Sequence, residues 1–345
     1  MDWRSLYAAN QAAITGAGVP TGGLTLPVLG ARSPSRAAPP SGRAPRGSEP
    51  RRPLQTLVHV PSGLNPTTPV PLVCMLHGCT QNPATFSDAT LMNQAADRHG
   101  FVVVYPGQDH DHNPQGCWNW FAPEHQQRDR GEPAAIAAAL HSVIDSSAQY
   151  AIDPQRVFVA GLSAGGAMAA IMAACYPDVF AAAAVHSGLA YRSATDVRSA
   201  FSVMAHGGGD PTIQGRAAHA AMGPRARRVP TIVIHGTDDR TVSPVNAINV
   251  LRQAMTANHL AAPTTCEHSP EDPSTVRRGH SDGGRSYTES RWLDPDGTLT
   301  HELLMIDGLG HAWAGGAAGG SYADPRGPSA SDAIWRFFAA ASSAG

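Results

Sequence analysis

The sequence contains no lysine, so all 25 of its basic residues are arginine. This excludes lysine Schiff-base chemistry, a pyridoxal-phosphate lysine and the lysine of a phosphate-binding loop. The arginines nearly balance 27 acidic residues, which gives a formal net charge of -2. Because no global field attracts nucleic acid or acidic lipid, we expect neither as a partner.

Cysteine and long apolar runs are also scarce. Five cysteines without a C-x-x-C pair do not suggest a disulfide scaffold or a thiolate zinc site, and their odd number leaves at least one thiol unpaired within the chain. No run approaches the roughly 18 apolar residues of a membrane span, and the first residues lack the apolar core of a signal peptide. The sequence as written favours a soluble, cytoplasmic protein, with secretion as the alternative. It does not indicate an oligomeric state.

Composition divides the chain into two parts. Residues 31–53 consist almost entirely of Arg, Pro, Ser, Ala and Gly, which bury too little apolar surface to order a segment. We therefore interpret residues 1–53 as an N-terminal extension with a flexible linker, and docking of its arginines on an anionic surface as the alternative. Residues 54–345 are expected to form one folded domain.

In this domain short apolar runs alternate with helix-like stretches. The runs lie at residues 54–60, 71–78, 101–106, 156–161, 181–188, 230–236 and 301–308. Most are continuously apolar, which is typical of parallel strands covered on both faces, so the alternation predicts a doubly wound α/β sheet. Residues 285–307 are expected to form a hairpin, and residues 189–229 a partial lid or extended loops.

The most specific local pattern is Gly161-Leu-Ser163-Ala-Gly165, between an expected strand and an expected helix. A serine on so sharp a turn has a strained backbone and needs small neighbours, which Gly161, Gly165 and Gly166 provide. The turn places the Ser163 hydroxyl at the carboxyl edge of the sheet and at a helix N-terminus, which favours negative charge. The pattern predicts a nucleophilic serine. The alternative is a serine that only caps the helix.

A serine hydroxyl needs a base to become nucleophilic, and the base needs an acid to orient it. Both follow along the chain, each just after an expected strand. We expect His311 to be the general base. Two adjacent aspartates, Asp238 and Asp239, compete for the orienting role.

The oxyanion of an acyl transfer also needs hydrogen-bond donors. One is expected to be the backbone N–H of Ala164, directly after the nucleophile. The other is expected after the strand at residues 71–78, where Gly78 allows a tight turn and Cys79 or Thr80 presents an N–H.

Further motifs are spread over residues 54–345. They are LHGCTQNPATF, GCWNWF, RGEPAAIAA, GLSAGGAMAA, YPDVFAAAAVHSGL, HGTDDRTV and GHAWAGG. Together they resemble the poly(3-hydroxybutyrate) depolymerase family of serine esterases, which also includes feruloyl and acetyl-xylan esterases. The resemblance implies an α/β-hydrolase fold and ester hydrolysis through an acyl-enzyme without a metal or organic cofactor. It carries the catalytic roles onto Ser163, Asp239 and His311, because the H-G-x-x-D-x-x-V spacing of α/β-hydrolases falls on Asp239.

Three tryptophans are expected near this site. Trp118, Trp120 and Trp313 would form an apolar wall for a hydrophobic ester, although core packing is an equal alternative for the first two. Exposed tryptophans would favour a polymer surface as substrate, and buried ones a small soluble ester. The substrate ranked first is a hydroxyalkanoate polyester or its oligomers, followed by feruloyl and acetyl-xylan type esters.

The remaining polar and sulfur side chains have more than one interpretation. The resemblance brings the loops of Cys79 and Cys117 towards the site, where either a disulfide or two free buried thiols is open. A disulfide would indicate an oxidising compartment. His110 and His112 have no third ligand at a suggestive spacing, so we expect a polar loop and no metal site. Glu132 is expected to support the start of a helix.

Three functions of other classes are weaker. A serine peptidase of the prolyl type has the same serine turn, but it normally carries a large extra domain that this sequence does not suggest. A noncatalytic granule-associated protein would use the Arg-rich linker. This function would be indicated if the Ser163→Ala variant had the same effect in the cell as the wild type. A hydrolase fold used only for binding would be expected to lack a triad residue, and all three are present.

Overall fold

The computed structural model describes residues 53–146, 150–263 and 267–342, which belong to a unit beginning at Pro53. The predicted N-terminal extension lies, apart from Pro53, outside the described residues, and so does Cys266. The division of the chain into an extension and a catalytic domain stays a prediction. None of the helices in the described ranges is both long enough and apolar enough to span a membrane.

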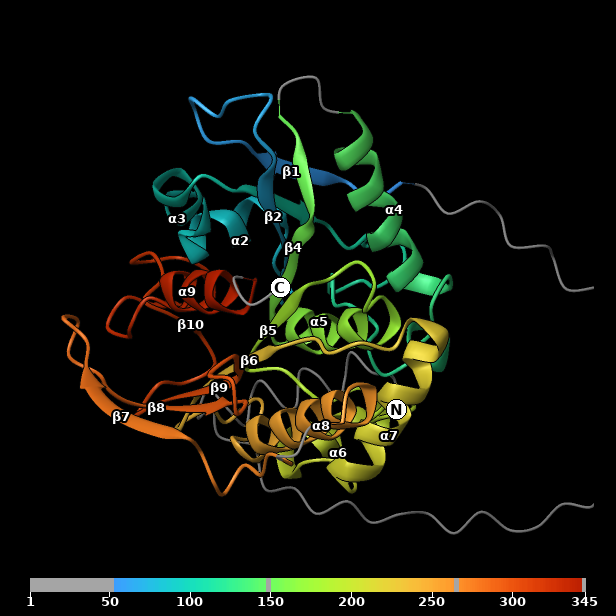
Figure 1. The fold of residues 1–345 in the computed structure, drawn as a ribbon, viewed down its shortest axis with the longest axis vertical. Helices are drawn as coiled ribbons and strands as arrows, with labels where there is room; N and C mark the ends of the chain where they lie inside the picture. Colours follow the sequence, from blue (N-terminus) through green and yellow to red (C-terminus); the bar gives the residue numbers. More distant parts are fainter. Residues whose placement is uncertain (1–52, 147–149, 264–266, 343–345) are drawn as a thin grey trace, which may run out of the picture. The chain divides into compact units, whose positions relative to one another are not determined.

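A nine-stranded sheet forms the centre of the described unit (Figure 1). In sheet order its strands are β1 (Thr56–His59), β3 (Val102–Pro106), β2 (Val70–Leu76), β4 (Ile152–Leu162), β5 (Ala182–His186), β6 (Thr231–Gly236), β9 (Leu299–Ile306), β8 (Ser286–Leu293) and β7 (Thr275–His280). The strands from β3 to β9 in this order are parallel to one another. β1 at one edge, and β8 and β7 at the other, run antiparallel to their neighbours.

Helices cover both faces of the sheet (Figure 1). One face carries α2 (Pro83–Thr90), α3 (Met92–His99) and α9 (Ala330–Ser342). The other carries α4 (Gly131–Ser146), α5 (Ala164–Cys175), α6 (Val197–His206), α7 (Pro211–Met222) and α8 (Val245–Ala261). Apolar side chains of the central strands pack against both layers, which confirms the predicted doubly wound sheet.

Two segments differ from the sequence expectation. Residues 189–229 do not form extended loops, because Asp196 and Asp210 cap two helices, α6 and α7, whose apolar side chains pack into the core. The predicted hairpin is present as β8 and β9, but β7 extends it by a further strand. β7 has the sequence TVRRGH and is almost wholly exposed, so it lacks the apolar run that identifies a strand.

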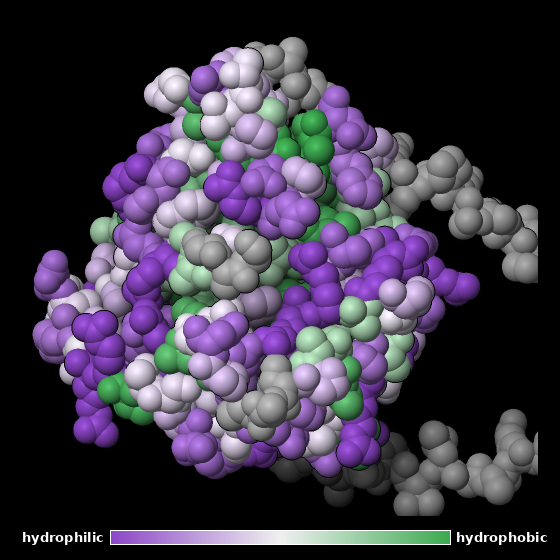
Figure 2. Space-filling view, in the orientation of Figure 1, coloured by the Kyte–Doolittle hydropathy of each residue, from purple (hydrophilic) through white to green (hydrophobic). Residues whose placement is uncertain are grey.

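The surface seen in the orientation of Figure 1 is mostly hydrophilic, with smaller apolar areas between the hydrophilic ones (Figure 2). The largest apolar side chains lie inside, and Trp118, Trp292 and Trp313 are fully buried. Burial of this apolar surface is the main favourable term for the fold.

Candidate active site

Ser163 lies in the turn between β4 and α5, in a backbone conformation that is rare for any residue except glycine. Its φ and ψ are 58° and -119°. Such strain costs on the order of 1–3 kcal/mol and persists only where the surroundings hold it. Here the Ser163 N–H donates to the carbonyl of His186 at 2.9 Å, and its own carbonyl accepts from Ala167 at 2.9 Å. The turn therefore places a half-buried hydroxyl at the carboxyl end of β4.

The glycines of this turn are required by close packing. A Cβ on Gly165 would lie 2.0 Å from the carbonyl oxygen of Leu76, and one on Gly161 would lie 2.3 Å from the backbone of Gly165. Only glycine fits at either position, because neither neighbour is a flexible side chain. The G-x-S-x-G spacing thus reflects contact between α5, β4 and β2.

His311 and Asp239 are joined by a hydrogen bond. Nδ1 of His311 donates to Oδ2 of Asp239 at 2.8 Å. The other carboxylate oxygen accepts from the N–H groups of Thr241 at 3.0 Å and Val242 at 2.9 Å. Burial alone would raise the pKa of Asp239, but His311 and the remaining donors lower it below its usual value. An ionised, fixed acceptor therefore orients the imidazole.

The structure distinguishes the two adjacent aspartates. Asp239 is 3% exposed and bonded to His311, whereas the Asp238 side chain is exposed. Asp239 also lies 3.5 Å from Nε2 of His235, which donates to the carbonyl of Val242 at 2.8 Å. The geometry selects Asp239, as the α/β-hydrolase spacing does.

Ser163, Asp239 and His311 follow β4, β6 and β9, which run parallel in the same sheet. Their carboxyl ends therefore meet at one edge. His186, on β5 between them, joins the segments, because its carbonyl accepts from Ser163 and its Nε2 accepts from Ala314 at 3.2 Å. Burial lowers the pKa of His186 to about 3, so it remains a neutral structural side chain.

The oxyanion donors expected from the sequence flank this serine. Ala164 is the first residue of α5, where a backbone N–H has no partner within the helix. Gly78 lies against the serine, since a Cβ on it would be 3.5 Å from the Ser163 Cβ. The N–H of Thr80 donates to the carbonyl of Gln115 at 2.7 Å, which leaves Cys79 as the better of the two candidates after Gly78.

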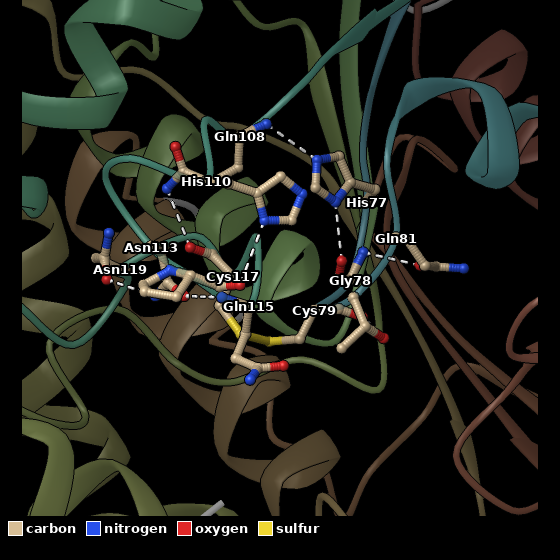
Figure 3. Close-up of a disulfide and its surroundings, with 12 residues drawn as sticks. His77, Gly78, Cys79, Gln81, Gln108, His110, Asn113, Gln115, Cys117 and Asn119 are labelled. Atoms are coloured by element: carbon tan, nitrogen blue, oxygen red, sulfur yellow. Dashed lines mark hydrogen bonds between the residues drawn. A yellow bond between two sulfur atoms is a disulfide. The ribbon is translucent and has the colours of Figure 1, made fainter. Parts of the chain in front are cut away.

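A disulfide joins Cys79 to Cys117 (Figure 3). Of the two interpretations that the sequence left open, the structure has the bonded one. The bond connects the turn after β2 to the loop that follows β3. Cys79, which the sequence predicts as an oxyanion donor, is thus covalently held by a second loop.

The predicted wall of tryptophans is not formed in the structure. Trp118 and Trp313 are 0% exposed and Trp120 is 5% exposed, so all three pack in the core. The Trp313 ring stacks on His186 at 5.0 Å and its N–H donates to Ser331, which turns the indole away from solvent. The expected substrate contact of Trp313 is therefore corrected, and for Trp118 and Trp120 the structure has the core alternative.

Sequence reasoning missed Tyr322. Its ring centroid lies 6.2 Å from that of His311, and its side chain is 36% exposed. Its carbonyl accepts from the N–H of Trp313 at 2.7 Å, where the short strands β10 (Trp313–Ala314) and β11 (Ala323–Asp324) pair. No spacing in the sequence around Tyr322 indicates this pairing.

Two smaller expectations concern residues around this site. His110 and His112 are both exposed in a polar loop. Glu132 lies in the first turn of α4, as expected, but it is also fully buried and accepts hydrogen bonds from Gln108 and Asn119. Within the described ranges, no group of three or more His, Cys, Asp or Glu side chains is placed to bind a metal ion.

Comparison with known proteins gives consistent matches. The family described as Esterase PHB depolymerase matches residues 55–277. The chain is 36% identical over 260 residues to a poly(3-hydroxyalkanoate) depolymerase C of Paucimonas lemoignei, which covers 75% of this chain and 58% of the relative. It is 30% identical over 208 residues to a feruloyl esterase B of Thermothelomyces thermophilus, which covers 58% of this chain and 69% of the relative. The chain thus spans only 58% of the depolymerase that it matches.

A solved structure shows the fold. An acetyl xylan esterase from Aspergillus awamori superposes with a TM-score of 0.64 at 22% identity, over 82% of this chain and 93% of that chain. Together with the largely parallel sheet and its helices on both faces, this likeness identifies an α/β-hydrolase fold.

Proposed function

The chain belongs to the Esterase PHB depolymerase family, and we propose that it is a serine carboxylic-ester hydrolase acting through an acyl-enzyme. One observation carries the proposal. The buried Asp239 fixes His311 at the sheet edge where the strained backbone of Ser163 presents its hydroxyl. A nucleophile, a general base and an acid that orients the base are the parts that acyl transfer requires.

The proposed reaction has two halves. Nδ1 of His311 donates to Asp239, so Nε2 is the atom that takes the proton as Ser163 Oγ attacks the ester carbonyl. The N–H groups of Ala164 and Cys79 stabilise the tetrahedral oxyanion, and each such donor is typically worth about 10²–10³ in kcat. His311 then returns the proton to the departing alcohol. Water, activated by the same imidazole, attacks the acyl-enzyme and releases the acid.

The substrate that we propose first is an oligomer of a hydroxyalkanoate ester. The depolymerase relative supports this acyl class, and the feruloyl esterase relative keeps aryl esters as the second candidate. Burial of Trp118, Trp120 and Trp313 removes the exposed indoles that would favour a polymer surface. Tyr322, exposed beside His311, is the aromatic side chain best placed to contact such an ester.

The disulfide is evidence for the compartment in which the protein functions. Disulfides persist in oxidising compartments and are rare in the reducing cytosol. The bond between Cys79 and Cys117 therefore supports secretion over the cytoplasmic placement that the sequence favoured. Retention of this bond in protein isolated from its natural host would test the placement.

Hydrolysis assays test the function. We expect the wild type to cleave p-nitrophenyl butyrate and soluble 3-hydroxybutyrate oligomers faster than a feruloyl ester, with slower release from amorphous polyhydroxybutyrate. Ser163→Ala should lower every one of these rates at least about 10³-fold. Equal rates for the two proteins would contradict the nucleophile. Faster cleavage of the feruloyl ester would contradict the substrate order.

A further inference from the structure

Glu132 is a fully buried carboxylate that the proposed reaction does not use. Its oxygens accept from the backbone N–H of Asn119 at 2.7 Å, from the Asn119 side-chain amide at 2.6 Å and from the Gln108 amide at 2.5 Å. Nε2 of His125 lies 4.0 Å away, and Nδ1 of that ring accepts from the Glu132 N–H. These amide groups are all donors, and both carboxylate oxygens of Glu132 act as acceptors. A buried carboxylate is costly unless it is satisfied in this way.

The bonded donors at Glu132 belong to the loop at residues 108–119. This loop holds the oxyanion turn in three ways, of which the disulfide and the bond between Gln108 and His77 can be followed in Figure 3. Cys117 forms the disulfide with Cys79. The carbonyl of Gln115 accepts from Thr80 at 2.7 Å, and the backbone N–H of Gln108 donates to Nε2 of His77 at 3.1 Å.

Gln108 and His77 connect the loop at residues 108–119 to Gly78 through a chain of hydrogen bonds. His77 Nδ1 donates to the carbonyl of Gly78 at 2.8 Å while its Nε2 accepts from Gln108, so the imidazole is neutral and fixed in one tautomer. The Gln108 amide, besides reaching Glu132, donates to the carbonyl of Cys117 at 3.0 Å. A change at Glu132 therefore reaches both Gly78, the residue before Cys79, and Cys117, the disulfide partner of Cys79.

We infer that Glu132 is a positioning residue for the oxyanion hole. By anchoring the loop at residues 108–119 to the start of α4, it keeps the Cys79 N–H directed at the oxyanion that forms on Ser163. Glu132 itself does not touch substrate. The inference rests on the proposed function, because it requires Cys79 to be an oxyanion donor.

Glu132→Gln is the main test, because it keeps the size of the side chain and replaces one acceptor oxygen by an NH₂ group that faces donors. We expect kcat for p-nitrophenyl butyrate to fall about 10- to 100-fold while KM changes less than threefold, since the donor acts on the transition state. Affinity for a phenylboronic acid, whose boron accepts the Ser163 oxygen to form a tetrahedral adduct, should fall by a similar factor.

A matched control separates positioning from stability. Glu302 is also a fully buried carboxylate, and it forms ion pairs with Arg291 and Arg336. It lies in the first half of β9, the strand whose carboxyl end leads to His311. Glu302→Gln should lower the urea midpoint and leave kcat and boronate affinity within twofold of the wild type. A merely structural role of Glu132 would give the same result for Glu132→Gln.

Gln108→Met keeps the inference testable if Glu132→Gln does not fold. It removes the amide that reaches Glu132 and Cys117 and retains the backbone bond to His77, so the same loss of kcat and boronate affinity is expected. The inference would be overturned if folded Glu132→Gln kept kcat and boronate affinity within twofold of the wild type. If Glu132→Gln does not fold, the same result for folded Gln108→Met would overturn it. Failure of the proposed function is recognised separately, by full activity of Ser163→Ala.

Discussion

At the residue scale, two adjacent carboxylates have different environments. Asp239 is buried and accepts from His311, Thr241 and Val242, whereas Asp238 is exposed. Asp239→Asn should lower kcat by about 10³- to 10⁴-fold, because an amide at this position no longer fixes the imidazole tautomer that accepts the serine proton. Asp238→Asn, the matched control, should stay within twofold of the wild type. Steady-state kinetics with p-nitrophenyl butyrate measures both, and a larger loss in Asp238→Asn would reverse the assignment.

The sequence predicted the placement of those candidate residues that lie in a local turn after a strand. Ser163 and Asp239 follow apolar strands, and the sharp turn after a strand needs the glycines and spacing that the sequence displays. Trp313 was predicted wrongly because its nearness to His311 in the chain does not determine which way its ring points. Tyr322 was missed because it reaches His311 through the pairing of β10 and β11, two strands of two residues each.

At the element scale, Gln81 connects two loops that are far apart in the sequence. Its side-chain oxygen accepts from the N–H of Gly78 at 2.9 Å, and its amide donates to the carbonyl of Ser321 at 2.8 Å. Gly78 precedes the proposed oxyanion donor Cys79, and Ser321 precedes Tyr322, which lies beside His311. One buried amide thus links the oxyanion turn to the segment next to the base.

Gln81→Met should therefore lower kcat about 10-fold, and its unpaired Gly78 N–H should also lower the free energy of unfolding by about 1–3 kcal/mol. Gln253 offers a matched control, because its amide spans Tyr191 N–H and C=O at 2.8 and 2.9 Å and is equally buried. Gln253→Met should lose similar stability without the loss of kcat. Urea unfolding and steady-state kinetics measure stability and kcat for both variants. Equal kcat values for the two variants would contradict a role of Gln81 in linking the oxyanion turn to the segment next to His311.

Elements were predictable where burial and sequence pattern agree. The parallel strands are continuously apolar because both of their faces are covered, and each of the seven apolar runs overlaps an observed strand. β7 and the helices α6 and α7 were missed for the opposite reason. β7 is held mainly by pairing with β8, and α7 lacks a strong apolar periodicity. α6 is amphipathic, but it is short and lies in a stretch that is polar overall.

At the scale of the whole molecule, buried histidines determine the response to acid. Burial lowers the pKa of His77 to about 4, and the pKa values of His186 and His301 to about 3. The pKa of His235 is also lowered by burial. The unfolded chain takes up these protons below about pH 6.5, whereas the folded protein does not. Their contribution to stability is therefore complete above about pH 6.5 and is lost as the pH falls towards each folded-state pKa.

We predict a lower urea midpoint at pH 5 than at pH 7.5. Each of these histidines contributes up to about 1.4 kcal/mol per pH unit below pH 6.5, which is the free energy of one pKa unit. Glu302, whose pKa is raised by burial, acts in the opposite direction but is a single group. Unfolding curves at constant ionic strength measure the difference. An equal or higher midpoint at pH 5 would contradict the neutral, buried state of these side chains.

The most direct test of the central claim is covalent labelling of the nucleophile. The wild type and Ser163→Ala are treated with a serine-reactive phosphonate, and the modified peptide is located by mass spectrometry. We predict one label per chain, on Ser163, with loss of hydrolysis in proportion to labelling and no label on Ser163→Ala. Label on a different residue with the same loss of activity, or full hydrolysis by Ser163→Ala, would contradict the account.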